Sequence, residues 1–190
     1  MFSGSGRCLS VDCWFRLRRW YDSSLRCMSW PRYLIVLQVV VMYCAAGIEK
    51  MGFAWTPWGG YSALFLILQD WAVARYSFDW LAAQPFYALT QLGTAGTLMW
   101  EWTAPLMVVA LYTKASARPP GRLGRLLEMV YFREGWLLVG LLFHFALVIT
   151  MELGIFPFAM VTTYIAFYHP DEWQRWLARR GLLSLSEAAR

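Results

Sequence analysis

Four ionisable side chains interrupt or end the long apolar stretches of this sequence. Glu49 and Lys50 follow one apolar run, Glu101 lies inside a second, and His144 lies inside a third. An amine withdrawn from water favours its neutral form, which can accept a proton, and carboxyl and imidazole groups can exchange protons with it. These residue types therefore suit acid–base chemistry in an apolar pocket. They equally suit polar contacts that only hold helices together.

Glu101 is the most costly of these residues if its segment lies in a membrane. It is the only charged residue of the 28-residue segment 86–113. A carboxylate at the centre of a bilayer costs about 2.5–3.5 kcal/mol unless it is paired, protonated or hydrated. Two alternatives stay open: a structural hydrogen bond to Gln38, a threonine or a tryptophan indole, and a role in lining a pocket.

Helical spacing groups further polar and small residues with these side chains. One predicted face of the first apolar segment carries Gln38, Met42, Ala45 and Glu49. A similar arc in the second segment carries Gln91, Thr94, Thr97 and Glu101. Because such faces are costly in lipid, we expect both to face protein, together with the small residues Gly93 to Gly96. His144 has Gly140 one turn away, which leaves room for a neighbouring side chain.

The composition predicts the elements that must position these residues. Hydrophobic residues make up 59% of the 190 residues, charged residues only 15%, and there are 12 tryptophans. This balance predicts an all-α, polytopic membrane protein with about four transmembrane helices. The expected spans are 33–48, 86–113 and two halves of the block 135–168. A single helix over that block would be about 50 Å long against a hydrocarbon core of about 30 Å, so it must break, and ELGIFP (152–157) offers glycine and proline.

Three parts are expected along the chain: an interfacial segment 1–30, a transmembrane domain 31–170, and an interfacial helix and tail 171–190. The face of the first part is formed by Trp14, Leu17, Tyr21, Leu25 and Met28. Basic residues are concentrated before the first span, in the middle loop and in the tail, whereas the first loop has only Lys50 and Arg75. The positive-inside rule then predicts both termini on the cytoplasmic or equivalent side, and the opposite loop should carry a short helix near residues 61–70.

Several other classes of site find no support in the pattern. The four cysteines lack metal-type spacing, so free thiols are expected, and no metal site is predicted. The net charge of +5 falls in short blocks between apolar spans, which suits anionic lipid headgroups rather than nucleic acid. With only two histidines, a buried hydrogen-bonding role for His144 is preferred to haem ligation. The expected partners are therefore the lipid bilayer and other membrane subunits.

Three segments in order resemble one known family. They are AGIEKMGFAWTPWGGYS, WEWTAPLMVV and FHFALVITMELGIFPFAMVTTYIAFYHPDEW. They are similar to segments of the vitamin K-dependent gamma-carboxylase and the related bacterial HTTM transmembrane family. The resemblance extends over residues 38–173, about seven tenths of the chain, and three weak motifs in order are more specific than one.

The resemblance implies a role for each candidate residue. In the carboxylase, the lysine of the first segment is the base that acts on vitamin K hydroquinone, and Lys50 stands at the matching position. Glu49, Glu101 and His144 would then line a pocket for a quinone or another lipid, although no cofactor is specified by the residues themselves. The family normally has further helices before the lysine segment, and the carboxylase adds a substrate domain. We find neither in this sequence, so we expect an accessory subunit of a larger membrane complex.

Two alternatives to the accessory subunit stay open. One is a membrane enzyme that acts on a quinol-type substrate with Lys50 as base. The other is a non-catalytic protein that binds a quinone, lipid or pigment. Glu49 occupies a position where the carboxylase commonly has a lysine or a neutral residue, and a carboxylate beside Lys50 favours the charged ammonium, which is not a base.

Overall fold

The part of the chain that the structure describes is helical. The structure, a computed structural model, describes residues 15, 30–116 and 119–180. The whole of the face expected in segment 1–30 therefore lies outside the described residues. Among the described residues, strand-like pairing is limited to one isolated bridge between Ala74 and Met151. The expectation of an all-α fold is confirmed. The chain divides into two compact units, Met1–Val36 with Ile165–Arg190, and Leu37–Tyr164.

The first long helix, α2 (Trp30–Glu49), begins with Pro31 in its first turn, where the missing amide hydrogen costs nothing. It is followed by the short 3-10 turns η2 (Phe53–Trp55) and η3 (Pro57–Gly59) and by α3 (Ala63–Gln69). The expected short helix near residues 61–70 is thus confirmed. Gly60, which lies between η3 and α3, has a φ of 64°, a backbone conformation that favours glycine. A last 3-10 turn, η4 (Asp79–Ala82), leads into the next long helix.

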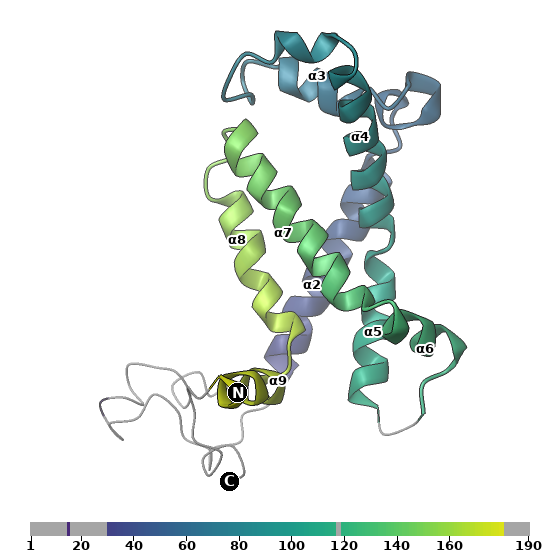
Figure 1. Ribbon diagram of the computed structural model, residues 1–190, viewed down its shortest axis with the longest axis vertical. Helices are drawn as coiled ribbons and strands as arrows, with labels where there is room; N and C mark the ends of the chain where they lie inside the picture. Colours follow the sequence, from purple (N-terminus) through teal and green to yellow (C-terminus); the bar gives the residue numbers. More distant parts are fainter. Residues whose placement is uncertain (1–14, 16–29, 117–118, 181–190) are drawn as a thin grey trace. The chain divides into compact units, whose positions relative to one another are not determined.

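Segment 86–113 forms two helices rather than the single span predicted from the sequence. These are α4 (Phe86–Trp102) and α5 (Ala104–Ala115), and they meet at Thr103 (Figure 1). Pro105 has no amide hydrogen to donate to the carbonyl of Glu101, which interrupts the helical ladder. At the same point the Thr103 hydroxyl donates a hydrogen bond to the carbonyl of Trp100 at 2.7 Å. The break therefore lies directly beside Glu101.

The apolar block after residue 130 breaks where the sequence predicts. Helix α6 (Arg122–Met129) precedes α7 (Phe132–Thr150), and α8 (Phe156–Thr163) continues into the 3-10 turn η5 (Tyr164–Phe167). The connection contains Gly154, with a φ of 58°, and the amide of Glu152 donates to the carbonyl of Val73. Two features differ from expectation: α7 begins at Phe132, before Gly135, and α6 is a helix that the sequence did not predict. The final helix is α9 (Pro170–Arg179).

Packing within the unit Leu37–Tyr164 joins helices that are near one another in sequence. Helix α3 packs against α4, α5 against α6 and α7, and α7 against α8. A small apolar core under the loops contains the buried residues Leu68, Leu81 and Met151. These contacts leave most long helices with one face packed and one face exposed.

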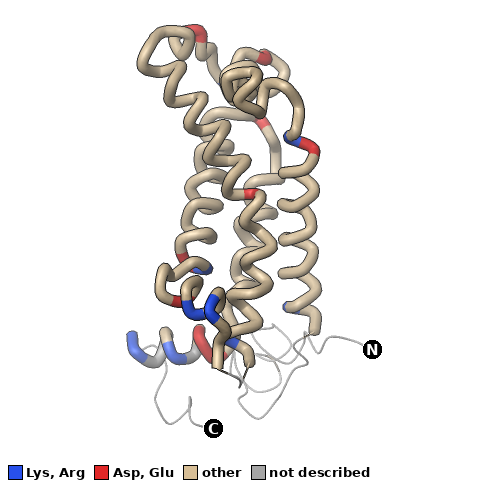
Figure 2. Tube along the Cα trace, turned by 90° about the vertical axis from the view of Figure 1, so that its right-hand side faces the viewer, with Lys and Arg blue, Asp and Glu red and all other residues tan. Residues whose placement is uncertain are grey.

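Two described helices satisfy the length and composition of a membrane span. They are Trp30–Glu49 and Phe132–Thr150, and two further apolar helices, Ala104–Ala115 and Phe156–Phe167, are shorter. Figure 2 shows that the helices carry long stretches without a charged residue, with most charges near their ends. The larger number of spans expected from the sequence stays a prediction.

Candidate functional site

Lys50 and Glu101 form an ion pair that joins the end of α2 to the end of α4. The Lys50 ammonium donates to Glu101 Oε1. The side chain of Glu101 is only 3% exposed, whereas that of Lys50 is 22% exposed. The Lys50 nitrogen also lies 5.1 Å from the ring centroid of Trp55, at a distance that permits a cation–π interaction. The carboxylate is therefore the buried partner, and the ammonium lies between it and the surface.

Close packing of α2 against α4 sets the geometry of this pair. The indole of Trp102 donates to the carbonyl of Gly47 at 3.0 Å. A Cβ on Gly47 would meet the same indole nitrogen at 3.0 Å, so glycine is needed for this approach. Gly47 and Trp102 each lie within three residues of the ion pair along the chain. This indole hydrogen bond therefore fixes how closely the backbones of α2 and α4 approach, and with it the distance that the Lys50 side chain must span to reach Glu101.

One oxygen of Glu101 has no partner within the described part of the chain. Glu101 Oε2 is buried and makes no hydrogen bond there, although Oε1 is bound by Lys50. A buried carboxylate oxygen without a partner is energetically costly. It can accept a hydrogen bond from a hydroxyl or water that approaches it, or it can carry a proton. The carboxyl group therefore keeps hydrogen-bonding capacity that the described residues do not use.

A second polar cluster lies deeper in the same unit. The Tyr43 hydroxyl forms hydrogen bonds to His144 Nε2 at 2.8 Å and to the Tyr164 hydroxyl at 2.7 Å. All three residues are buried, and His144 Nδ1 has no hydrogen-bond partner among the described residues. A Cβ on Gly140 would clash with the Tyr164 hydroxyl and would lie 2.7 Å from Trp100 Cζ2. Gly140 therefore provides the space that this cluster needs, as its sequence position one turn from His144 indicated.

Two tryptophans hold α4 against α7 beside this cluster. The indole of Trp100 donates to the carbonyl of Trp136 at 3.0 Å, and the indole of Trp136 donates to the carbonyl of Trp100 at 3.1 Å. The ring of Tyr43 lies edge-on to both, with centroid distances of 4.6 and 5.2 Å. The aromatic residues thus orient the Tyr43 hydroxyl toward His144 and Tyr164.

The structure brings together some of the predicted site residues and separates others. Lys50 and Glu101 are in direct contact, whereas Gln38, one of the expected hydrogen-bond partners of Glu101, is exposed. His144 belongs to the second cluster. Glu49 is exposed and lies in neither cluster.

The face of α2 that was expected to contact protein is not buried within this chain. Its expected members Gln38, Met42, Ala45 and Glu49 are all exposed. The buried positions of this helix are instead Val36, Val39, Val40, Tyr43 and Gly47. The physical reason is that Tyr43 and Gly47 form the specific contacts with other helices, so the helix turns those residues inward. The polar arc expected in α4 does contact other parts of the chain. Thr94 and Glu101 are buried, and Gln91 donates to the carbonyl of Gly60 at 2.6 Å.

Sequence reasoning did not identify Tyr43, Tyr164, Trp100 or Trp136 as site residues. One signal was present: Tyr43 precedes Lys50 by seven residues, two helical turns, so the two share a face. Among the described residues, no group of three or more His, Cys, Asp or Glu side chains is arranged to hold a metal ion. Cys44 is a free thiol.

The comparisons with known proteins yield no relative. No family model, no curated protein and no solved structure matches the chain.

Proposed function

We propose that this chain is a multi-pass integral membrane protein similar to the HTTM and gamma-carboxylase-like family, acting as a non-catalytic accessory subunit of a larger membrane complex. The observation that carries the proposal is the pairing of Lys50 with the buried carboxylate of Glu101. The terminal nitrogen of Lys50 is already bound to Glu101 Oε1, so the side chain is engaged between two helices. Lys50 then joins α2 to α4 rather than accepting a proton from a substrate.

Membrane insertion is supported by the character of the exposed helix faces. Exposed large apolar side chains occur along α2, α4 and α7, including Leu37, Leu92 and Leu138. The positive-inside distribution of the arginines supports both termini on the cytoplasmic or equivalent side. In an alkaline carbonate wash, we expect the full chain to stay with the membrane pellet. Release into the supernatant would contradict membrane integration.

A partner subunit is supported by an unfilled notch between α4 and α7. Gly93, Gly96, Thr97, Trp100, Val139, Leu142 and Phe143 line it. A Cβ on Gly96 would meet nothing within 4 Å, so this glycine faces open space in the notch. Small residues on an open face let a transmembrane helix of another subunit approach closely. We therefore assign the notch to such a helix.

The notch gives a test of the accessory role. A tagged full chain purified from its native membrane in mild detergent should carry stoichiometric partner subunits. Gly96→Leu should fill the notch and reduce the recovered partner at least severalfold, while the thermal midpoint of the chain itself stays unchanged. Leu92→Phe, at an exposed position of the same helix outside the notch, is the matched control and should keep the partner. Purification of the wild-type chain alone would overturn the accessory role.

The second candidate function is a quinol-type membrane enzyme with Lys50 as base. The observation that favours it is that Glu101 Oε2 and His144 Nδ1, in the unit Leu37–Tyr164, are buried polar atoms without a partner among the described residues. Lys50→Arg separates the candidates, because arginine keeps the ion pair but does not act as a base. The accessory role predicts wild-type partner recovery for this variant. The enzyme predicts a quinol-consuming activity of the wild-type protein that Lys50→Arg abolishes.

A further inference from the structure

Helix α9, in the unit that contains Ile165–Arg190, carries charged and aromatic side chains in a defined arrangement. Its acidic residues help to begin the helix: the Glu172 carboxylate accepts a hydrogen bond from the backbone amide of His169 at 3.0 Å, and Asp171 lies 3.3 Å from the His169 ring nitrogen. Such contacts satisfy donors at the start of a helix. The first turn therefore uses its carboxylates locally.

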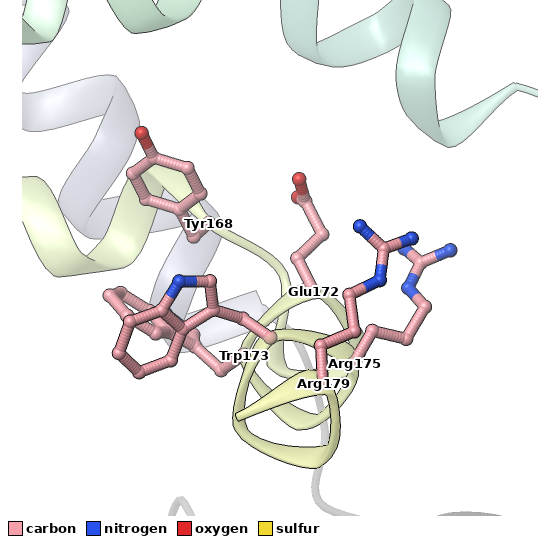
Figure 3. A pocket seen from close by; sticks show the side chains of 6 residues that line it. Tyr168, Glu172, Trp173, Arg175 and Arg179 are labelled. Carbon is pink, nitrogen blue, oxygen red and sulfur yellow. The ribbon is translucent and has the colours of Figure 1, made fainter. Parts of the chain in front are cut away.

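An open cleft of about 550 Å³ lies over this helix. It is lined by Tyr168, Glu172, Trp173, Arg175, Trp176 and Arg179. Figure 3 shows Tyr168 and Trp173 on one side of the cleft and the guanidinium groups of Arg175 and Arg179 together on the other, with Glu172 between them. The ring of Trp173 lies 5.4 Å from that of Tyr168 and 6.2 Å from that of Trp176, measured between centroids.

The two arginines are arranged to bind a phosphate. Arg175 and Arg179 are four residues apart, so they project from the same side of the helix. Both are exposed, and Arg175 uses only its Nε atom internally, to bind the carbonyl of Asp171 at 3.2 Å. The planar guanidinium fork binds phosphate oxygens in pairs. Neither group forms an ion pair with a carboxylate within residues 30–116 or 119–180.

We propose that this cleft is a binding site for the headgroup phosphate of an anionic phospholipid. Arg175 and Arg179 bind the phosphate, and the rings of Tyr168, Trp173 and Trp176 contact the glycerol and upper acyl region. This inference rests on the proposed membrane function. The aromatic wall selects a lipid over a free phosphate, because tryptophan and tyrosine occupy the boundary between headgroups and hydrocarbon. The excess of positive charge selects an anionic over a zwitterionic headgroup.

The test is lipid retention by the full chain. Detergent-purified protein is incubated with phosphatidylglycerol or phosphatidylcholine, and bound lipid is counted by native mass spectrometry. We expect the wild type to retain phosphatidylglycerol preferentially. The variant R175Q/R179Q should bind it more weakly by about fivefold for each arginine removed. R122Q/R125Q on α6 removes the same charge from two exposed positions outside the cleft, and it should bind as the wild type does.

Three results would overturn the headgroup site. They are equal retention of both lipids by the wild type, equal losses in the two double variants, and displacement of the lipid by millimolar inorganic phosphate, which would indicate a site for free phosphate. Each double variant is also subjected to the carbonate wash. A wild-type chain that stays in the membrane without lipid preference would refute this inference alone, whereas a chain released by carbonate would refute the proposed function as well.

Discussion

The unit Leu37–Tyr164 contains two buried polar clusters that are built differently. In the Lys50–Glu101 pair, opposite formal charges meet where helices end, and one partner is partly exposed. In the cluster of Tyr43, His144 and Tyr164, two hydroxyl groups and an imidazole meet between helix interiors, and all three are buried. The difference indicates that a charge is accommodated where one partner can reach solvent, and that deeper positions use groups that can stay neutral.

The largest expected effect comes from removing one member of the ion pair. Lys50→Met leaves the Glu101 carboxylate buried without its counter-ion, which should lower the free energy of unfolding by about 3–5 kcal/mol. The double variant K50M/E101M removes both charges and should recover most of that loss. Thermal unfolding of the full chain in detergent measures both. If K50M were as stable as the wild type, the pair would not join the two helices.

A smaller effect is expected in the neutral cluster. Tyr43→Phe keeps the ring contacts with Trp100 and Trp136 but removes the hydroxyl that binds His144 and Tyr164. Because a buried group loses its partner, the cost should be about 1–3 kcal/mol. Phe is almost isosteric with Tyr, so a cavity does not complicate the measurement. A loss as large as that of K50M would remove the distinction between the clusters.

Gly140 tests the space on which the neutral cluster depends. Gly140→Ala should place a methyl group against the Tyr164 hydroxyl and Trp100, which costs about 1–3 kcal/mol. Gly135→Ala in the same helix is the control, since its Cβ would meet nothing within 4 Å. The control should match or slightly exceed wild-type stability, because alanine favours helix. Equal thermal unfolding midpoints for the two variants would show that the Tyr164 side chain can move aside without a loss of stability.

The smallest effect is expected at Glu49, which neighbours Lys50 in sequence but lies outside both clusters. Glu49→Gln should change stability by no more than about 0.5 kcal/mol, as is usual for exposed positions. Comparison with Glu101→Gln sharpens the contrast between an exposed and a buried carboxylate. A loss for E49Q equal to that for E101Q would mean that Glu49 takes part in the site.

The sequence was informative where a residue contrasts with its surroundings. Lys50 and Glu101 are conspicuous because charges are rare in the apolar segments, and Gly154 with Pro157 predicted the break between α7 and α8. The break at Thr103 was missed because Pro105 sits in an apolar pattern that continues across it. Proline within such a pattern does not by itself decide between a bend and an end.

Other features could not be read from local pattern. The contact between Lys50 and Glu101 joins residues 51 positions apart, and nothing in either segment encodes that pairing. Tyr43 and Trp100 did not stand out, because aromatic residues make up 18% of the chain. The face of α2 that is buried within this chain, with Tyr43 and Gly47, did not stand out, because it carries no charged residue. Polarity indicates a cost of exposure, whereas packing decides the rotation of the helix.

The reciprocal hydrogen bonds between Trp100 and Trp136 have a consequence for exchange of protons with solvent. Each indole proton is held by the backbone carbonyl of the opposite residue, so separating α4 from α7 at this point releases both protons in one event. Their exchange with deuterium should therefore be slow and should occur at a common rate. Exposed indoles, such as those of Trp58 and Trp71, should exchange quickly in the same sample. A pair of slowly exchanging indole resonances with a common rate would thus record how often the two helices separate.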